Sequence, residues 1–124
     1  MSKRDHRVTL HQIVEYVQHA QALCADKSAQ QIEADWRQAL AFERVMEVLG
    51  EAVKRLPEDL KQRYPQVPWR LVAGMRDKIS HGYDTVDYQT LLDAAQNDLP
   101  TLRATAELML RDMEVPPTAP PVSG

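Results

Sequence analysis

The stretch "RVMEVLGEAVKRL", residues 44–56, decides the fold, because it spaces its apolar side chains as a buried helix does. Val45, Met46, Leu49 and Val53 fall on one face of an α-helix, with charged residues between them. The stretch therefore predicts the second half of a long helix whose apolar face packs into a core.

The pattern continues on both sides of this stretch. Toward the N-terminus it extends through Leu40 and Trp36 to "SAQQ", residues 28–31, which has the form of a capping box and so predicts a helix start. Asp35, near the start of this long helical segment, predicts a break or kink. Other signals mark the remaining helices. A second capping-box form, "TLHQ" at residues 9–12, predicts the start of the first helix, and Pro57 predicts the start of a short helix over "PEDLKQRY". Pro68 predicts the start of a helix that stops at Gly82, and a last helix is predicted over 86–113 with a break at Pro100.

No segment has the alternating pattern or turn signals of strands. The sequence predicts an all-α protein, an antiparallel bundle of four to five helices formed by residues 1–114 as a single domain. The last ten residues, "VPPTAPPVSG" at 115–124, contain four prolines and predict a disordered tail.

Composition predicts a soluble globular protein, with 44% apolar and 27% charged residues in a chain of 124. No apolar run is long enough for a membrane span, and the charged N-terminus is not that of a signal peptide. The single cysteine, Cys24, excludes an internal disulfide and favours the cytoplasm. We expect no membrane association.

The charge is unevenly distributed. The net charge of −3 argues against broad nucleic-acid binding, yet residues 54–78 hold seven basic and three acidic residues, a local charge of +4. The basic segment ends in "MRDKISHGYD", residues 75–84, which places Arg76, His81 and Tyr83 close together.

Arginine and histidine are sufficient for cleaving RNA without a metal. A histidine can take the proton of the ribose 2′-hydroxyl and return it to the leaving oxygen, and an arginine can stabilise the charge developing on phosphorus. On a regular helix Arg76 and His81 would lie about 140° apart, so they converge only if His81 lies at a frayed end. A two-fold dimer that places two such helix ends together would supply the substrate cleft that one chain lacks. The simpler alternative is that both cations favour the negative end of a helix dipole.

The wider pattern resembles a known family. From about Val8 to Met113 the chain is similar to the HEPN superfamily, specifically to HepT-like toxins paired with minimal nucleotidyltransferase antitoxins. The resemblance rests on "RVMEVLGEAVKRL" at 44–56, "YPQVPWRLVAGMRDKISHGYDTVD" at 64–87 and "LPTLR" at 99–103.

This resemblance implies an all-α ribonuclease toxin that forms a homodimer and assembles further with its antitoxin. It implies Arg76 and His81 as the catalytic pair, with Asp77 as the polar position after the arginine, where asparagine is more usual. The negative charge of Asp77 beside a phosphate could lower activity. The resemblance also implies that Tyr83 is the tyrosine that the antitoxin adenylylates. The added AMP group would place a bulky anion over the cleft and repel RNA. We predict RNA contacts at Lys78 and Arg70, and no cofactor or metal.

Several alternatives remain open at this level. The chain could instead be a catalytically weak or inactive dimer that serves as the binding partner or substrate of a nucleotidyltransferase. Glu51 could be a structural acceptor for a helix end or for an arginine, or it could be part of the active-site surround. Trp36 and Trp69 are expected to anchor the core. The stripe His11, Glu15 and His19 could bind a metal but lacks a fourth ligand.

Overall fold

The structure is a computed structural model that describes residues 5–80 and 86–114, and throughout these ranges it contains helices and no strands. The described residues therefore confirm the all-α class. The helices are α1 (His6–Cys24), α2 (Ala29–Ala34), α3 (Trp36–Arg55), α4 (Glu58–Gln62), α5 (Trp69–Ser80), α6 (Tyr88–Asn97) and α7 (Leu99–Glu114).

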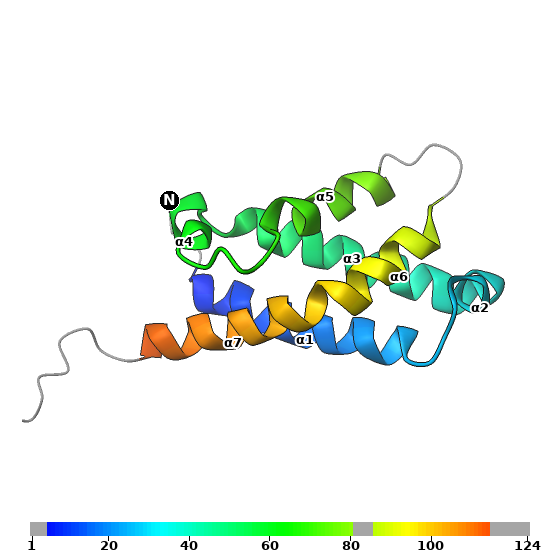
Figure 1. The fold of residues 1–124 in the computed structure, drawn as a ribbon, viewed down its shortest axis with the longest axis horizontal. Coiled ribbons are helices and arrows are strands. Elements are labelled where there is room, and N and C mark those ends of the chain that lie inside the picture. Colours follow the sequence, from blue (N-terminus) through cyan, green and yellow to red (C-terminus); the bar gives the residue numbers. More distant parts are fainter. Residues whose placement is uncertain (1–4, 81–85, 115–124) are drawn as a thin grey trace, which may run out of the picture.

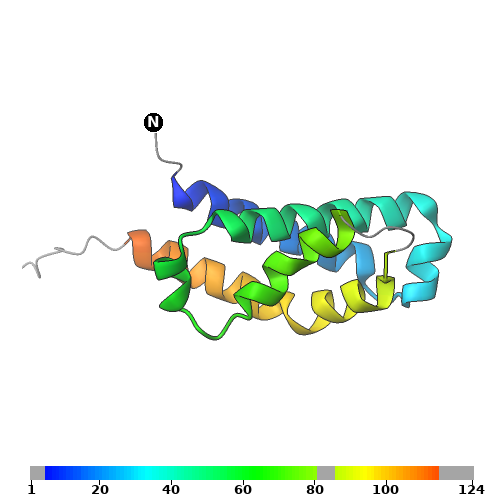
Figure 2. The same ribbon diagram turned by 90° about the horizontal axis from the view of Figure 1, so that it is seen from above.

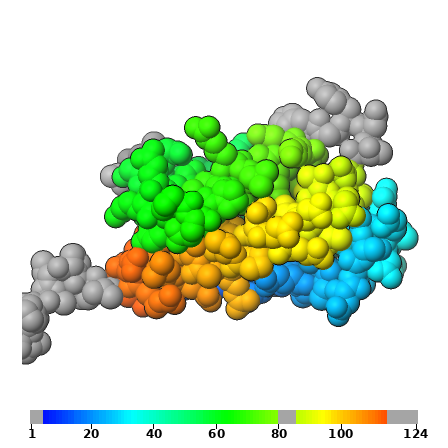
Figure 3. Space-filling view, in the orientation of Figure 1, coloured from blue at the N-terminus to red at the C-terminus, as the bar shows by residue number. Residues whose placement is uncertain are grey.

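Helix α3 lies between α5 and α1 in the view of Figure 1 and runs along one edge of the bundle in Figure 2. It packs on α1 along one side and on α5 along another, while α1 also packs on α7. The stretch at 44–56 supplies much of this contact, because Met46, Leu49 and Val53 are fully buried. Figure 3 shows α6 and α7 forming a continuous outer surface along the long axis, beneath α4 and α5.

Both expected breaks are present, so two of the predicted helical segments each become a pair of helices. At Asp35 the backbone is extended, and the carboxylate accepts hydrogen bonds from the first turn of α3, including one of 3.1 Å from the backbone N–H of Arg37. Ahead of it, the predicted capping box of Ser28 and Gln31 opens α2. The second break lies at Asp98, and Pro100 occupies the first turn of α7, where a missing N–H costs no helical hydrogen bond.

Two local predictions were wrong. Asp5, rather than Thr9, caps α1: its carboxylate accepts a hydrogen bond of 2.9 Å from the backbone N–H of Arg7. Thr9 instead is buried within the helix. Trp36 does not anchor the core, because 65% of its surface is exposed and its ring lies under the guanidinium of Arg37, at 5.2 Å. Leu40, one turn further along α3, is 57% exposed.

Trp69 does serve as a packing anchor. It packs against the core, and its indole N–H donates a hydrogen bond of 2.9 Å to the carbonyl of Tyr64, which fixes the proline-containing connector to the start of α5. The predicted tail at 115–124 lies outside the described residues, and α7 ends at Glu114. Within the described ranges no helix combines the length and hydropathy needed to cross a bilayer.

Candidate active site

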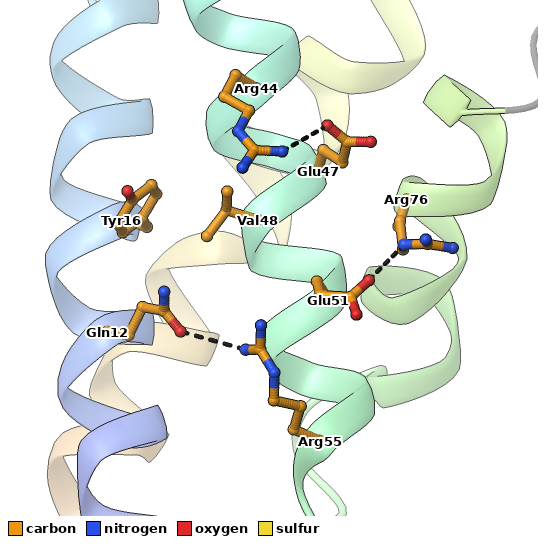
Figure 4. Close-up of a pocket in the computed structure, with 8 residues that line it drawn as sticks. All are labelled: Gln12, Tyr16, Arg44, Glu47, Val48, Glu51, Arg55 and Arg76. Carbon is orange, nitrogen blue, oxygen red and sulfur yellow. Dashed lines mark hydrogen bonds and ion pairs between the residues drawn. The ribbon is translucent and has the colours of Figure 1, made fainter.

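Arg76 lies on the last two turns of α5, on the side that faces α3. Its Nε pairs with a carboxylate oxygen of Glu51, which projects from α3 (Figure 4). The Arg76 side chain is 36% exposed, so part of its guanidinium stays open to solvent. Because Glu51 engages Nε, the remaining donors of Arg76 are on its two terminal nitrogens, one of which lies 3.5 Å from a carboxylate oxygen of Asp77.

Gly50 explains why α5 comes so close to α3 at this point. A Cβ built on Gly50 would lie 2.9 Å from the backbone nitrogen of Arg76 and 3.1 Å from the carbonyl oxygen of Val72. Both contacts are with backbone, which cannot move aside as the end of a side chain can. The adjacent pair Gly50 and Glu51 therefore sets the position of Arg76: glycine allows the approach and glutamate fixes the side chain.

Substituting Gly50 by alanine is expected to lower the free energy of unfolding by about 1–3 kcal/mol, because the added methyl group must push α5 away from α3. Urea denaturation of the two proteins measures this difference. Gly74→Ala is the matched control, since a Cβ there meets nothing within 4 Å and the same change within α5 should be neutral or stabilising by up to ~1 kcal/mol. Equal effects at the two positions would contradict the steric explanation.

Asp77 sits beside this pair with its charge balanced. Lys54 donates hydrogen bonds of 3.1 and 3.3 Å to its two carboxylate oxygens, and a terminal nitrogen of Arg76 lies 3.5 Å from one of them. Lys54, Asp77, Arg76 and Glu51 thus form a row of alternating charges across α3 and α5. The negative charge of Asp77 is compensated by Lys54 instead of acting alone beside a phosphate.

The two residues predicted to contact RNA, Lys78 and Arg70, do not line the groove beside Arg76. Lys78 lies two residues further along α5, about 160° around the helix, and lines a separate depression with Ile79 and Thr90. Arg70 lies at the opposite end of α5, near Lys61. Their RNA contacts remain predictions.

His81 and Tyr83 lie outside the described residues, so the convergence of Arg76 and His81 also remains a prediction. On either side of these residues, α5 continues through Ser80, and Asp87 caps α6. Hydrogen bonds from the backbone and hydroxyl groups of Thr90 hold the pKa of Asp87 below its usual value. Burial, together with a hydrogen bond donated to Glu43, raises the pKa of Tyr88 to about 12.

A groove of about 350 Å³ opens beside Arg76, between α1, α3 and α5 (Figure 4). Its lining residues are mostly polar: Gln12, Tyr16, Arg44, Glu47, Val48, Glu51, Arg55 and Arg76. Sequence reasoning missed Arg44 and Arg55 as site residues. The signal was available, because both share the helical face of α3 that carries Glu51.

The remaining candidates do not form a second site. Among residues 5–80 and 86–114 no group of three or more His, Cys, Asp or Glu side chains could hold a metal ion. In the stripe proposed for a metal, His19 instead pairs with Glu15 at 3.4 Å and contacts the ring of Tyr16 edge-on. Cys24 is buried, and burial raises its thiol pKa, which makes it a poor nucleophile.

Comparison with known proteins gives a consistent result. The family model described as ribonuclease HepT-like matches residues 13–109. The chain is 34% identical to MJ0125 of Methanocaldococcus jannaschii, named as a candidate RNase, over 92% of this chain and 98% of that protein. It is 33% identical to a protein of Thermococcus cleftensis named as a probable ribonuclease HepT, over 85% of this chain and 96% of the other. No solved structure matches the chain significantly.

Proposed function

The chain belongs to the HepT-like ribonuclease family, and on this premise we propose that it is a metal-independent endoribonuclease, the toxin of a toxin–antitoxin pair. The observation that carries the proposal is the setting of Arg76. This residue borders a polar groove, is oriented through Nε by Glu51, and precedes His81 by five residues.

The reaction uses the ribose 2′-hydroxyl of the substrate as its nucleophile. His81 accepts the proton of this hydroxyl while the 2′-oxygen forms a bond to phosphorus, and the bond from phosphorus to the 5′-oxygen of the next nucleotide breaks. The protonated His81 then gives its proton to that leaving oxygen. The products are a 2′,3′-cyclic phosphate and a free 5′-hydroxyl, and DNA is not cut because it lacks the attacking group.

Arg76 stabilises the negative charge that develops on the phosphoryl oxygens. Its fork of donors matches two oxygens of one phosphate, and a side chain already held by Glu51 loses little freedom when it binds. Asp77 helps to orient the guanidinium, and its own charge is balanced by Lys54. This arrangement supports catalysis with aspartate at position 77.

A homodimer would complete the cleft. The two motifs would meet across a two-fold axis, so that each chain contributes one wall. Trp36 and Leu40 support self-association, because they give α3 an exposed apolar patch that a second copy can cover. The antitoxin, a minimal nucleotidyltransferase, would silence the toxin in the cytoplasm by adenylylating Tyr83, placing a bulky anion where RNA must bind.

The proposal predicts RNA cleavage in excess EDTA. A defined RNA incubated with protein whose Tyr83 is unmodified should yield 2′,3′-cyclic phosphate ends, as resolved by mass spectrometry of the products. An otherwise identical RNA with one 2′-deoxy nucleotide at the cleavage position is the control and should resist cutting there. If the dimeric, unmodified protein cuts neither RNA, the ribonuclease proposal fails and a binding partner of the nucleotidyltransferase takes its place.

A further inference from the structure

The groove beside Arg76 carries one positive charge that no carboxylate of the described residues neutralises. It holds three arginines and two glutamates. Arg44 pairs with Glu47 at 3.1 Å and Arg76 pairs with Glu51, which leaves Arg55. The guanidinium of Arg55 donates a hydrogen bond of 3.3 Å to the neutral amide of Gln12, and in the described part of the chain it forms no ion pair.

Arg55 and Arg76 border the same groove from two different helices. It follows Glu51 by four residues on α3, one helical turn or roughly 6 Å along the axis. Glu51 in turn holds Arg76, so the two arginines border the same groove on either side of that carboxylate (Figure 4).

We propose that the groove is a subsite for single-stranded RNA, in which Arg55 binds the phosphate next to the one held by Arg76. Gln12 keeps the Arg55 guanidinium in place without cancelling its charge, so its remaining donors can bind a phosphate oxygen. Glu51 lies between the two arginines and prevents them from sharing a single phosphate. The inference rests on the proposed ribonuclease function, since it assigns the substrate strand a path from that site.

The lining favours RNA over a protein partner. Charged groups are depleted from the centre of protein interfaces, whereas five of the eight side chains here are charged. None of the large apolar side chains that the described surface exposes (Val8, Trp36, Leu40 and Leu71) lines the groove.

The test is the affinity of Arg55→Gln for an RNA strand that cannot be cut. A fluorescent single-stranded oligonucleotide with 2′-O-methyl groups throughout removes the nucleophile, and anisotropy then measures binding at several salt concentrations. The variant is expected to raise Kd about 10-fold, as for loss of a hydrogen bond to a charged group. It should also flatten the slope of log Kd against log salt by about 0.7, the value for one phosphate contact on a single strand.

Arg111→Gln is the matched control, because it removes the same charge from α7, away from the groove. Arg55→Lys should restore the salt slope and part of the affinity. Equal effects of the Arg55 and Arg111 changes, or an unchanged Kd and slope in Arg55→Gln, would overturn the subsite. A lost dimer with unchanged RNA affinity, measured by light scattering, would also overturn it and identify the groove as a protein interface.

These measurements separate the subsite from the proposed catalysis. If the wild type binds the oligonucleotide through Arg55 but cuts no RNA, the subsite stands and the ribonuclease proposal fails. If the wild type cuts RNA but Arg55→Gln binds the oligonucleotide as tightly as the wild type, the ribonuclease proposal stands and the subsite fails.

Discussion

The variant His81→Ala is expected to cleave RNA about 10²- to 10⁴-fold more slowly than the wild type, the usual contribution of a general acid–base group. The loss should appear in the single-turnover cleavage rate of a defined RNA, with the affinity for the 2′-O-methyl oligonucleotide little changed. The reason is that the imidazole moves a proton in the transition state, whereas the phosphate contacts remain with the arginines.

Arg76→Lys provides the complementary measurement. It keeps the positive charge but removes the planar fork that matches two phosphoryl oxygens, so its rate should fall while its cleavage products stay the same. Circular dichroism and light scattering would establish that each variant keeps the helical fold and the oligomeric state of the wild type. Wild-type cleavage rates in folded His81→Ala would exclude the mechanism proposed for this residue.

The variant Glu51→Ala is expected to lower the cleavage rate by about 10²-fold, because Arg76 would lose the carboxylate that orients it, and a misplacement of about 1 Å can cost that much. The ion pair is partly exposed, so its removal should change the free energy of unfolding by no more than ~1 kcal/mol. Glu51→Gln should recover much of the rate, since its amide oxygen can still accept a hydrogen bond from Nε. We expect the effect mainly in kcat, which separates positioning from substrate binding.

Glu107→Ala is a close control for this experiment. Glu107 pairs with Arg103 on α7, and the two side chains are 43% and 36% exposed, against 41% and 36% for Glu51 and Arg76. Removing Glu107 should therefore have a similar effect on stability and none on cleavage. Equal rate losses in the two alanine variants, or no rescue by Glu51→Gln, would show that Glu51 does not act by orienting Arg76.

The sequence predicted the helices well because periodic apolar spacing and caps are local signals. Asp35 and Pro100 both marked real breaks. The errors arose where two local signals competed. Thr9 has the form of a cap, but Asp5 lies earlier and opens the helix first. Trp36 continues the apolar stripe of α3, but the periodicity of one helix does not indicate how much of its length the neighbouring helices cover, and the side chain of Trp36 is left exposed.

The site was predictable only in part, for a related reason. The chemistry proposed for Arg76 rests on residue type and family resemblance. For Glu51 the sequence offered an arginine acceptor as one alternative, but it could not identify Arg76 as the partner, because that depends on where two helices cross. Their contact joins residues 25 positions apart and requires a glycine at position 50. The same crossing brings Lys54 to Asp77, which spacing along the chain does not indicate.

Helix α5 carries Arg76 and leads directly to His81, and its main packing partner is α3 alone, whereas α1 is packed against α3, α6 and α7. Arg76 is therefore held in place by the contact of α5 with one neighbouring helix, which is the most extensive contact between any two helices of the described residues. Any change that separates α5 from α3 would also separate Arg76 from Glu51, even where the contacts of α1 with α6 and α7 stay intact.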